Sequence, residues 1–241
     1  MDGTLISSIR NRYQHVLSLV ADATERSGRK AEAVQVVVVS KSKPLRVIQA
    51  ALAAGISKFG ENYAEEAVEK ITSLENDAVE WHMIGHVQSR KAEKVAEYFS
   101  MLHSLDSVQL AARLDRSCRE LNRRLPVLLE FNVSGEESKF GFQAWDEHQW
   151  SDLETDIEQI LNFSHMDVSG LMTMPPFFDD PEESRPYFKK LCQLQEYLAR
   201  KFPQVQWKEL SMGTSVDFLV AIQEGATYVR IGHAILGPRT E

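Results

Sequence analysis

Eight short runs rich in β-branched and aromatic residues alternate, from residue 35 onward, with longer segments whose apolar residues recur at helical spacing. The expected strands span 35–40, 58–60, 81–84, 101–105, 127–133, 168–173, 208–211 and 228–231. Such alternation is typical of parallel strands joined by crossover helices. Eight strands in about 200 residues favour a closed (β/α)8 TIM barrel, an α/β fold, over an open sheet.

A helix is also expected ahead of the first strand, over residues 5–26. Its apolar stripe consists of Ile9, Tyr13, Val16, Leu17 and Val20. Only ten residues follow Ile231, too few for a full crossover helix after the eighth strand. We therefore expect the N-terminal helix to complete the helical ring. Because the chain has no linker-like stretch or internal repeat, residues 1–241 are expected to form one domain.

The charge balance limits the class of partner. The chain has 35 acidic and 27 basic residues, a formal net charge of -8, which disfavours nucleic acid and anionic membranes. The first residues lack a signal-peptide pattern, and no apolar run reaches membrane-spanning length. Cys118 and Cys192 are expected to be packing residues, and neither has metal-ligand spacing around it. We expect a cytoplasmic monomer without metal, whose partners are small molecules or proteins.

The candidate site lies at the carboxyl ends of the strands, where barrels of this type build their active sites. Residues 211–215 end the seventh strand and open a helix, and residues 232–234 follow the eighth strand. Both segments contain glycine, which lets backbone N–H groups approach an anion, and helix N-termini favour negative charge. The two loops therefore predict a phosphate site, with tight turns and a Ser/Thr helix cap as the alternative.

Two lysines follow the valines of the first strand. Lys41 has the same parity as Val37 and Val39, so we expect it to point into the barrel near the mouth, with the phosphate loops across from it. Apolar surroundings lower the pKa of a lysine and favour the neutral amine that attacks a carbonyl, which predicts a Schiff base. Lys43 is expected at the rim, with its ammonium in solvent.

An aldehyde that also carries a phosphate suits this pairing, and pyridoxal 5'-phosphate (PLP) is such a molecule. Arg230, at the end of the eighth strand, is placed to face its pyridine nitrogen. A guanidinium donates hydrogen bonds and does not accept them, so the nitrogen would stay unprotonated and the ring would be a weaker electron sink.

Several runs, in chain order, resemble the pyridoxal phosphate homeostasis protein family, and the resemblance covers nearly the whole chain. They are Val39-Ser-Lys-Ser-Lys-Pro44, Phe59-Gly-Glu-Asn-Tyr63, Trp81-His-Met-Ile-Gly85, Gln88-Ser-Arg-Lys91, Gly135-Glu-Glu-Ser-Lys139, Gly170-Leu-Met-Thr-Met174, Leu210-Ser-Met-Gly213 and Val229-Arg-Ile-Gly232.

The resemblance implies a barrel like the N-terminal domain of alanine racemase, with PLP held as a Schiff base on Lys41. It also implies the remaining cofactor contacts. Ser211, Gly213, Gly232 and His233 would surround the phosphate, Arg230 would face the pyridine nitrogen, and Asn62 and Met172 would line the ring pocket. The family is thought to buffer and deliver PLP and to influence amino-acid and keto-acid balance, without an established reaction. Transient contacts with apo-enzymes that use PLP are therefore expected.

Two residues depart from the family pattern. Position 233 is His where relatives usually have Thr, and position 86 is His where relatives usually have Pro. Either histidine at the mouth would be a candidate general acid or base, although a solvated loop histidine is the more common case.

Two other functions remain open at this point. An amino-acid racemase would need a base on each face of the substrate α-carbon, and Lys41 supplies one of them. A class I aldolase-like barrel would use Lys41 to bind a phosphosugar directly.

Overall fold

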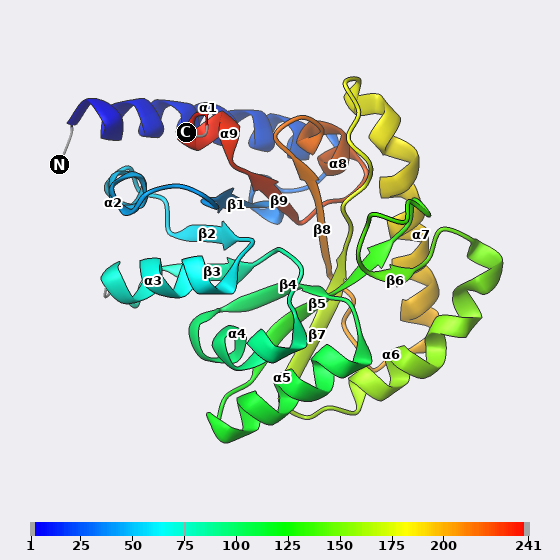
Figure 1. Ribbon diagram of the computed structural model, residues 1–241. Helices are drawn as coiled ribbons and strands as arrows, with labels where there is room; N and C mark the ends of the chain where they lie inside the picture. Colours follow the sequence, from blue (N-terminus) through cyan, green and yellow to red (C-terminus); the bar gives the residue numbers. More distant parts are fainter. Residues whose placement is uncertain (1–2, 75, 239–241) are drawn as a thin grey trace.

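A computed structural model describes residues 3–74 and 76–238 of the chain. The ring runs in the order β1 (Gln35–Val39), β2 (Lys58–Glu61), β3 (Glu80–Met83), β4 (Met101–Leu105), β5 (Leu125–Asn132), β7 (Met166–Met172), β8 (Glu209–Thr214) and β9 (Tyr228–Ile231). All neighbours pair in parallel, and β9 returns to β1 with Val38 opposite Ile231. The expected (β/α)8 barrel is therefore confirmed (Figure 1).

One further strand was not expected from the sequence. The two-residue strand β6 (Phe142–Gln143) pairs in parallel with the end of β5, beside the ring rather than in it. It was missed because two residues give no periodicity to detect.

Helices cover the outside of the ring (Figure 1). They are α1 (Gly3–Arg26), α2 (Leu45–Ala53), α3 (Ala64–Leu74), α4 (Ala92–Tyr98), α5 (Val108–Glu120), α6 (Glu154–Leu161), α7 (Arg185–Lys201), α8 (Phe218–Gln223) and α9 (His233–Leu236), with 3-10 turns η1 (Ala31–Ala33), η2 (Ser89–Lys91), η3 (Glu147–Leu153) and η4 (Pro181–Ser184). In α5, Leu110, Leu114 and Cys118 recur at helical spacing and are buried against the strands. The Ser107 hydroxyl caps this helix by accepting from the Leu110 N–H.

The N-terminal helix fills the gap in the helical ring, as expected. Helix α1 runs beside α8 and α9 (Figure 1) and buries Ile9, Val16 and Val20. The Arg12 guanidinium, through Nε, donates to the Ile235 carbonyl at 2.6 Å, which ties α1 to α9. Leu17 departs from the expected stripe and remains 38% exposed.

The barrel interior separates into an apolar layer and a polar one. Val37, Met101, Leu128, Met172 and Tyr228 form a buried cluster of their own, apart from the larger core between strands and helices. Buried polar side chains lie on the same strands, among them His103, Glu130 and Arg230. The interior is thus filled by side chains, as in other barrels of this size, and its polar members require partners.

Both cysteines are free thiols, Cys118 buried and Cys192 half-buried. Desolvation and the nearby Glu224 and Glu196 raise the pKa of Cys192 to about 12. Across the described ranges, no group of three or more His, Cys, Asp or Glu side chains is arranged to hold a metal ion. No helix within residues 3–74 or 76–238 is long and apolar enough to cross a membrane.

Gly170 offers a test of the strand pairing. A Cβ at this position would lie 1.9 Å from the Glu209 carbonyl oxygen, so Gly170→Ala would push β7 away from β8. We expect a loss of about 3 kcal/mol in the free energy of unfolding, measured by urea denaturation, because a packed interior resists added volume. In the control Gly3→Ala the added Cβ meets no atom within 4 Å, and the change should stay below about 1 kcal/mol. Equal effects of the two substitutions would contradict the tight β7–β8 register.

Candidate functional site

Ring closure brings the Lys41 loop and the loop after β9 side by side. Because β1 pairs with β9, these loops are neighbours, which corrects the expectation that they lie across the mouth from each other. A Cβ at Gly232 would lie 3.0 Å from the Val39 carbonyl oxygen, two residues before Lys41. Glycine at position 232 thus permits the close approach. The loop after β8 lies one strand further round.

The turn after β1 is held in one conformation by hydrogen bonds from neighbouring elements. Lys41 is half-buried, and Ser42 adopts a left-handed conformation with φ of 59°. The Ser42 N–H donates to Glu66 Oε1 at 2.7 Å, and the Ser40 N–H donates to the Gly60 carbonyl at 3.0 Å. A left-handed serine is uncommon, so these bonds are what maintain the turn.

A buried lysine organises the base of this turn. Lys70 Nζ donates to the Ser40 carbonyl at 2.8 Å, to Glu61 Oε1 at 2.7 Å and to Glu66 Oε1 at 2.6 Å. The Ser40 hydroxyl donates to the same Glu61 oxygen at 2.6 Å. Burial raises the pKa of Glu61, while Lys70 and the Ser40 hydroxyl oppose that rise. The ammonium of Lys70 therefore balances the carboxylates beside the Lys41 turn.

Removing that ammonium should be costly. In Lys70→Met the Glu61 carboxylate, which is fully buried, would lose its cation, and we expect a loss of about 3 kcal/mol in the free energy of unfolding. The control is Arg116→Met, which breaks the exposed Arg116–Glu120 pair and should change stability by less than about 1 kcal/mol. Chemical denaturation of both variants at neutral pH measures the difference. A Lys70→Met variant as stable as Arg116→Met would show that the network adds nothing.

The expectation that Lys43 extends into solvent is wrong. Its side chain is buried, with only 7% of the residue exposed, and Nζ donates to the Gly237 carbonyl at 2.9 Å and to the Pro238 carbonyl. The turn after α9 reaches back over the β1–α2 loop and supplies these acceptors. Sequence parity did not reveal this contact because the acceptors are backbone atoms 194 and 195 residues away.

Arg230 is fixed in the barrel interior by three neighbours. Its Nη1 donates to the Ser211 hydroxyl, and its Nη2 contacts the Thr173 carbonyl oxygen and Met174 Sδ, each at 2.9 Å. Burial lowers the pKa of Arg230 to about 10, and the carboxylates of Asp217 and Glu130 oppose the decrease. The guanidinium therefore stays charged at neutral pH, as a buried cation directed by its hydrogen bonds.

A line of buried side chains continues from Ser211. The Ser211 hydroxyl lies 2.8 Å from His103 Nδ1, and His103 Nε2 lies 2.9 Å from His82 Nδ1. Desolvation, the Lys58 ammonium and weaker opposing effects of Glu80 bring the pKa of His82 to about 4. Desolvation, with His82 and Arg230 nearby, holds the pKa of His103 well below its usual range. Both imidazoles are neutral at pH 7.

The other predicted cofactor residues lie around the same end of the barrel, and their roles remain predictions. Met172 is fully buried in the interior cluster, and Asn62 is half-buried after β2. Gly213 has φ of 92°, a conformation that favours glycine, and packs against α8. The next residue, Thr214, donates its N–H and hydroxyl to the Asp217 carboxylate at 2.7 and 3.0 Å. His233 is exposed at the start of α9.

A cavity of about 530 Å³ opens at the mouth, and Asn62, Tyr63, His86 and Phe140 are among its lining residues. His86 Nδ1 lies 2.7 Å from Asp106 Oδ2, and its ring stacks on Phe140 at 3.9 Å between centroids. The imidazole is therefore oriented by a carboxylate and an aromatic face rather than lying loose in the loop. Whether it acts as an acid or base stays a prediction.

Glu130, on β5, is a buried carboxyl that sequence analysis missed. Burial and the Asp106 carboxylate raise its pKa to about 7, and the nearby Arg230 guanidinium opposes the rise. Its Oε2 has no hydrogen-bond partner among the described residues. His82 and His103 were missed as well. All three are polar residues on otherwise apolar barrel strands, Glu130 and His82 each between two apolar neighbours and His103 beside Ser104, and that pattern was the available signal.

Glu130→Gln tests this environment through the pH dependence of stability. The pKa of Glu130 is about 7 in the folded chain against an ordinary 4.5, so the folded state retains a proton that the unfolded state releases. Wild-type stability from this group therefore falls as pH rises from 4.5 to 7. The neutral amide should raise the free energy of unfolding by about 3 kcal/mol above pH 7, with the gain vanishing near pH 4.

Thermal and urea unfolding from pH 4 to 8 would measure this difference. The exposed Glu137→Gln serves as a matched control and should show no such slope. A pH-independent difference between Glu130→Gln and the parent would contradict a raised pKa at Glu130.

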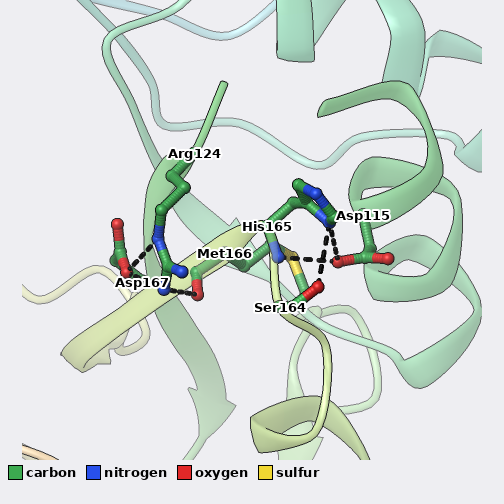
Figure 2. Close-up of polar contacts among 6 residues, drawn as sticks. All are labelled: Asp115, Arg124, Ser164, His165, Met166 and Asp167. Atoms are coloured by element: carbon green, nitrogen blue, oxygen red, sulfur yellow. Dashed lines mark hydrogen bonds and ion pairs between the residues drawn. The ribbon is translucent and has the colours of Figure 1, made fainter. Parts of the chain in front are cut away.

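A second cavity, of about 420 Å³, lies at the opposite end of the barrel beside Arg124 and Asp167. Nearby, Ser164, His165 and Asp115 come together in a group that superficially resembles a catalytic triad (Figure 2). The Asp115 carboxylate and the Ser164 hydroxyl both contact His165 Nδ1, at 3.2 and 3.1 Å. A relay requires partners on opposite ring nitrogens, so this group is a structural contact rather than a nucleophile.

Known proteins match this chain over nearly its whole length. Residues 17–240 match the family described as alanine racemase, N-terminal domain. The pyridoxal phosphate homeostasis protein of Vibrio alginolyticus is 37% identical over 238 residues, which cover 97% of this chain and 99% of that protein. The chain belongs to the pyridoxal phosphate homeostasis protein family.

Solved structures extend the comparison to three dimensions. The PLP-bound structure of PipY from Synechococcus elongatus is 32% identical, with a TM-score of 0.82, and the match covers 95% of this chain and all of PipY. An alanine racemase from Clostridium difficile is 14% identical, with a TM-score of 0.68 over 95% of this chain and 56% of the racemase. This homeostasis-family chain thus shares the racemase barrel fold, and the racemase extends beyond it.

Proposed function

We propose that this protein is a PLP carrier that binds the cofactor covalently through Lys41 and takes part in PLP homeostasis. The observation that supports this most strongly is the juxtaposition of the Lys41 turn, on β1, with the buried Arg230 guanidinium, on the adjacent strand β9. The PLP named in the PipY structure and the naming of the Vibrio relative support the same ligand. In this proposal residues 1–241 act as one cytoplasmic, monomeric domain that contacts apo-enzymes transiently.

The residues present fit PLP at three points. The half-buried Lys41 supplies an amine for the aldehyde. The donor-only Arg230 suits the unprotonated pyridine nitrogen. Backbone N–H groups in the loops of Gly213, Gly232 and His233 would bind the phosphate, with Asn62 and Met172 beside the ring.

When bound, PLP supplies a reactive aldehyde and an electron-withdrawing ring, and the protein determines how strongly the ring withdraws electrons. Arg230, still charged at neutral pH, disfavours a proton on the ring nitrogen. An unprotonated ring stabilises a carbanion poorly, which suits storage better than turnover. A racemase would also need a second base opposite Lys41. The His86–Asp106 pair at the mouth is the candidate that the racemase alternative would have to use.

The visible absorption spectrum of the purified protein, before and after borohydride reduction, tests the proposal. We expect a yellow protein whose reduced adduct maps to Lys41 by peptide mass spectrometry. Lys41→Ala should abolish the absorbance and the adduct, whereas the exposed Lys30→Ala should retain both. An adduct on a different lysine would refute the assignment of Lys41. A protein that takes up no PLP would favour the aldolase-like alternative, and racemisation of alanine at an ordinary enzymatic rate would overturn the carrier role.

A further inference from the structure

We propose that Ser211, His103 and His82 form a one-way hydrogen-bond chain that positions Arg230 toward the ring nitrogen of the bound cofactor. The positioning role rests on the proposed PLP-binding function. The hydrogen bonds themselves are formed by protein side chains alone. It spans four strands, from Arg230 on β9 through Ser211 on β8 and His103 on β4 to His82 on β3. All four residues are buried.

The direction of the chain follows from Arg230. A guanidinium only donates, so the Ser211 hydroxyl oxygen must accept from Nη1. The hydroxyl has one hydrogen, and its other neighbour is His103 Nδ1 at 2.8 Å. If that nitrogen carried its own proton, the Ser211 hydrogen would lack an acceptor in a fully buried position, which proteins avoid. Ser211 therefore donates to His103.

The tautomers of both histidines are then determined. A neutral His103 that accepts at Nδ1 carries its proton on Nε2, which donates to His82 Nδ1 at 2.9 Å. His82 must in turn carry its proton on Nε2. That nitrogen lies 3.8 Å from Glu80 Oε2, whose carboxylate also pairs with Lys58 at the amino end of the strands. Every hydrogen bond points away from Arg230, and the chain ends beside a carboxylate.

The Tyr228 ring packs against both imidazoles. The ring of Tyr228 lies 5.1 Å from the His103 ring and 5.9 Å from the His82 ring, between centroids. The Tyr228 hydroxyl accepts from Gln35 Nε2 at 3.3 Å and takes no part in the chain. Tyr228 therefore packs against the chain without adding a hydrogen bond to it.

The consequence for Arg230 is orientation. Ser211 holds Nη1, while Thr173 and Met174 hold Nη2, so the guanidinium plane is fixed from two sides. The charged groups that act on Arg230 are the carboxylates of Asp217 and Glu130. Because the Ser211 hydrogen is committed to His103, the side chain of Ser211 cannot also donate to a phosphate. Ser211 is thus a positioning residue for Arg230 rather than a phosphate ligand through its hydroxyl.

The tautomers can be measured without any cofactor. In the full-length protein with ¹⁵N-labelled histidine, we expect His103 and His82 each to show a pyridine-like Nδ1 and a protonated, pyrrole-like Nε2 at pH 7. The assignment uses His103→Asn and His82→Gln to remove each signal in turn. A protonated Nδ1 on His103 would reverse the chain and overturn the proposal, whatever the outcome of the PLP experiments.

The effect on Arg230 needs the loaded protein. With ¹⁵N-labelled PLP, we expect the ring nitrogen of the parent to be unprotonated and hydrogen-bonded. His103→Leu removes the acceptor of Ser211, so it should shift the ring-nitrogen resonance and weaken PLP binding about tenfold, as for one hydrogen bond to a charged group. His103→Asn, which keeps an acceptor near the Nδ1 position, should restore both values. Tyr228→Phe, which keeps the aromatic packing, should leave both unchanged.

The outcomes separate this proposal from the one it rests on. A parent that takes up no PLP refutes the carrier function, while the histidine tautomers still decide the direction of the chain. The positioning role is overturned if the parent binds PLP and His103→Leu has the same ring-nitrogen resonance and the same PLP affinity as the parent. If His103→Leu does not fold, His103→Asn decides. The PLP ring-nitrogen resonance in that variant is expected to equal the parent's, and a shifted resonance contradicts the proposal.

Discussion

Closure of the parallel ring by the β1–β9 pairing is the constraint on which the rest of the structure depends. With Val38 opposite Ile231, the first and last strands share one edge, and the residues that follow them must meet at the mouth. The same closure removes the interior from water, so every polar side chain directed inward needs a partner from a neighbouring strand. The proximity of the Lys41 turn to the loop after β9 results from that single geometric condition.

Electrostatics then determine what the interior can bind. Cations and carboxylates alternate through the buried region, with Lys70 between Glu61 and Glu66, and Arg230 near Glu130. The neutral histidines between Arg230 and the amino end of the barrel transmit hydrogen-bond direction without adding charge. Such a site selects ligands by their pattern of hydrogen-bond donors and acceptors. The donor-only Arg230 favours a ligand ring nitrogen that accepts a hydrogen bond.

Much of this could be predicted from the sequence, because strand periodicity and the residues at strand ends are local signals. The eight strands and the N-terminal helix followed from them. The contacts of Lys43 with carbonyls near residue 237 did not, since they depend on how distant segments pack. The interior chain was also missed: the β3–β4 pairing brings His82 and His103 within 2.9 Å, and His103 reaches Ser211 on β8, a strand distant in the sequence. Short β6 lacked a pattern altogether.

The burial of Lys43 has a consequence for what the barrel mouth presents to solvent. Lys41 and Lys43 are two residues apart, and a freely diffusing aldehyde would meet two similar amines if both projected outward. Nζ of Lys43 donates to the backbone carbonyls of Gly237 and Pro238, and the side chain is buried. The turn after α9 therefore holds the Lys43 side chain through main-chain carbonyls, so it does not extend into solvent at the rim of the barrel.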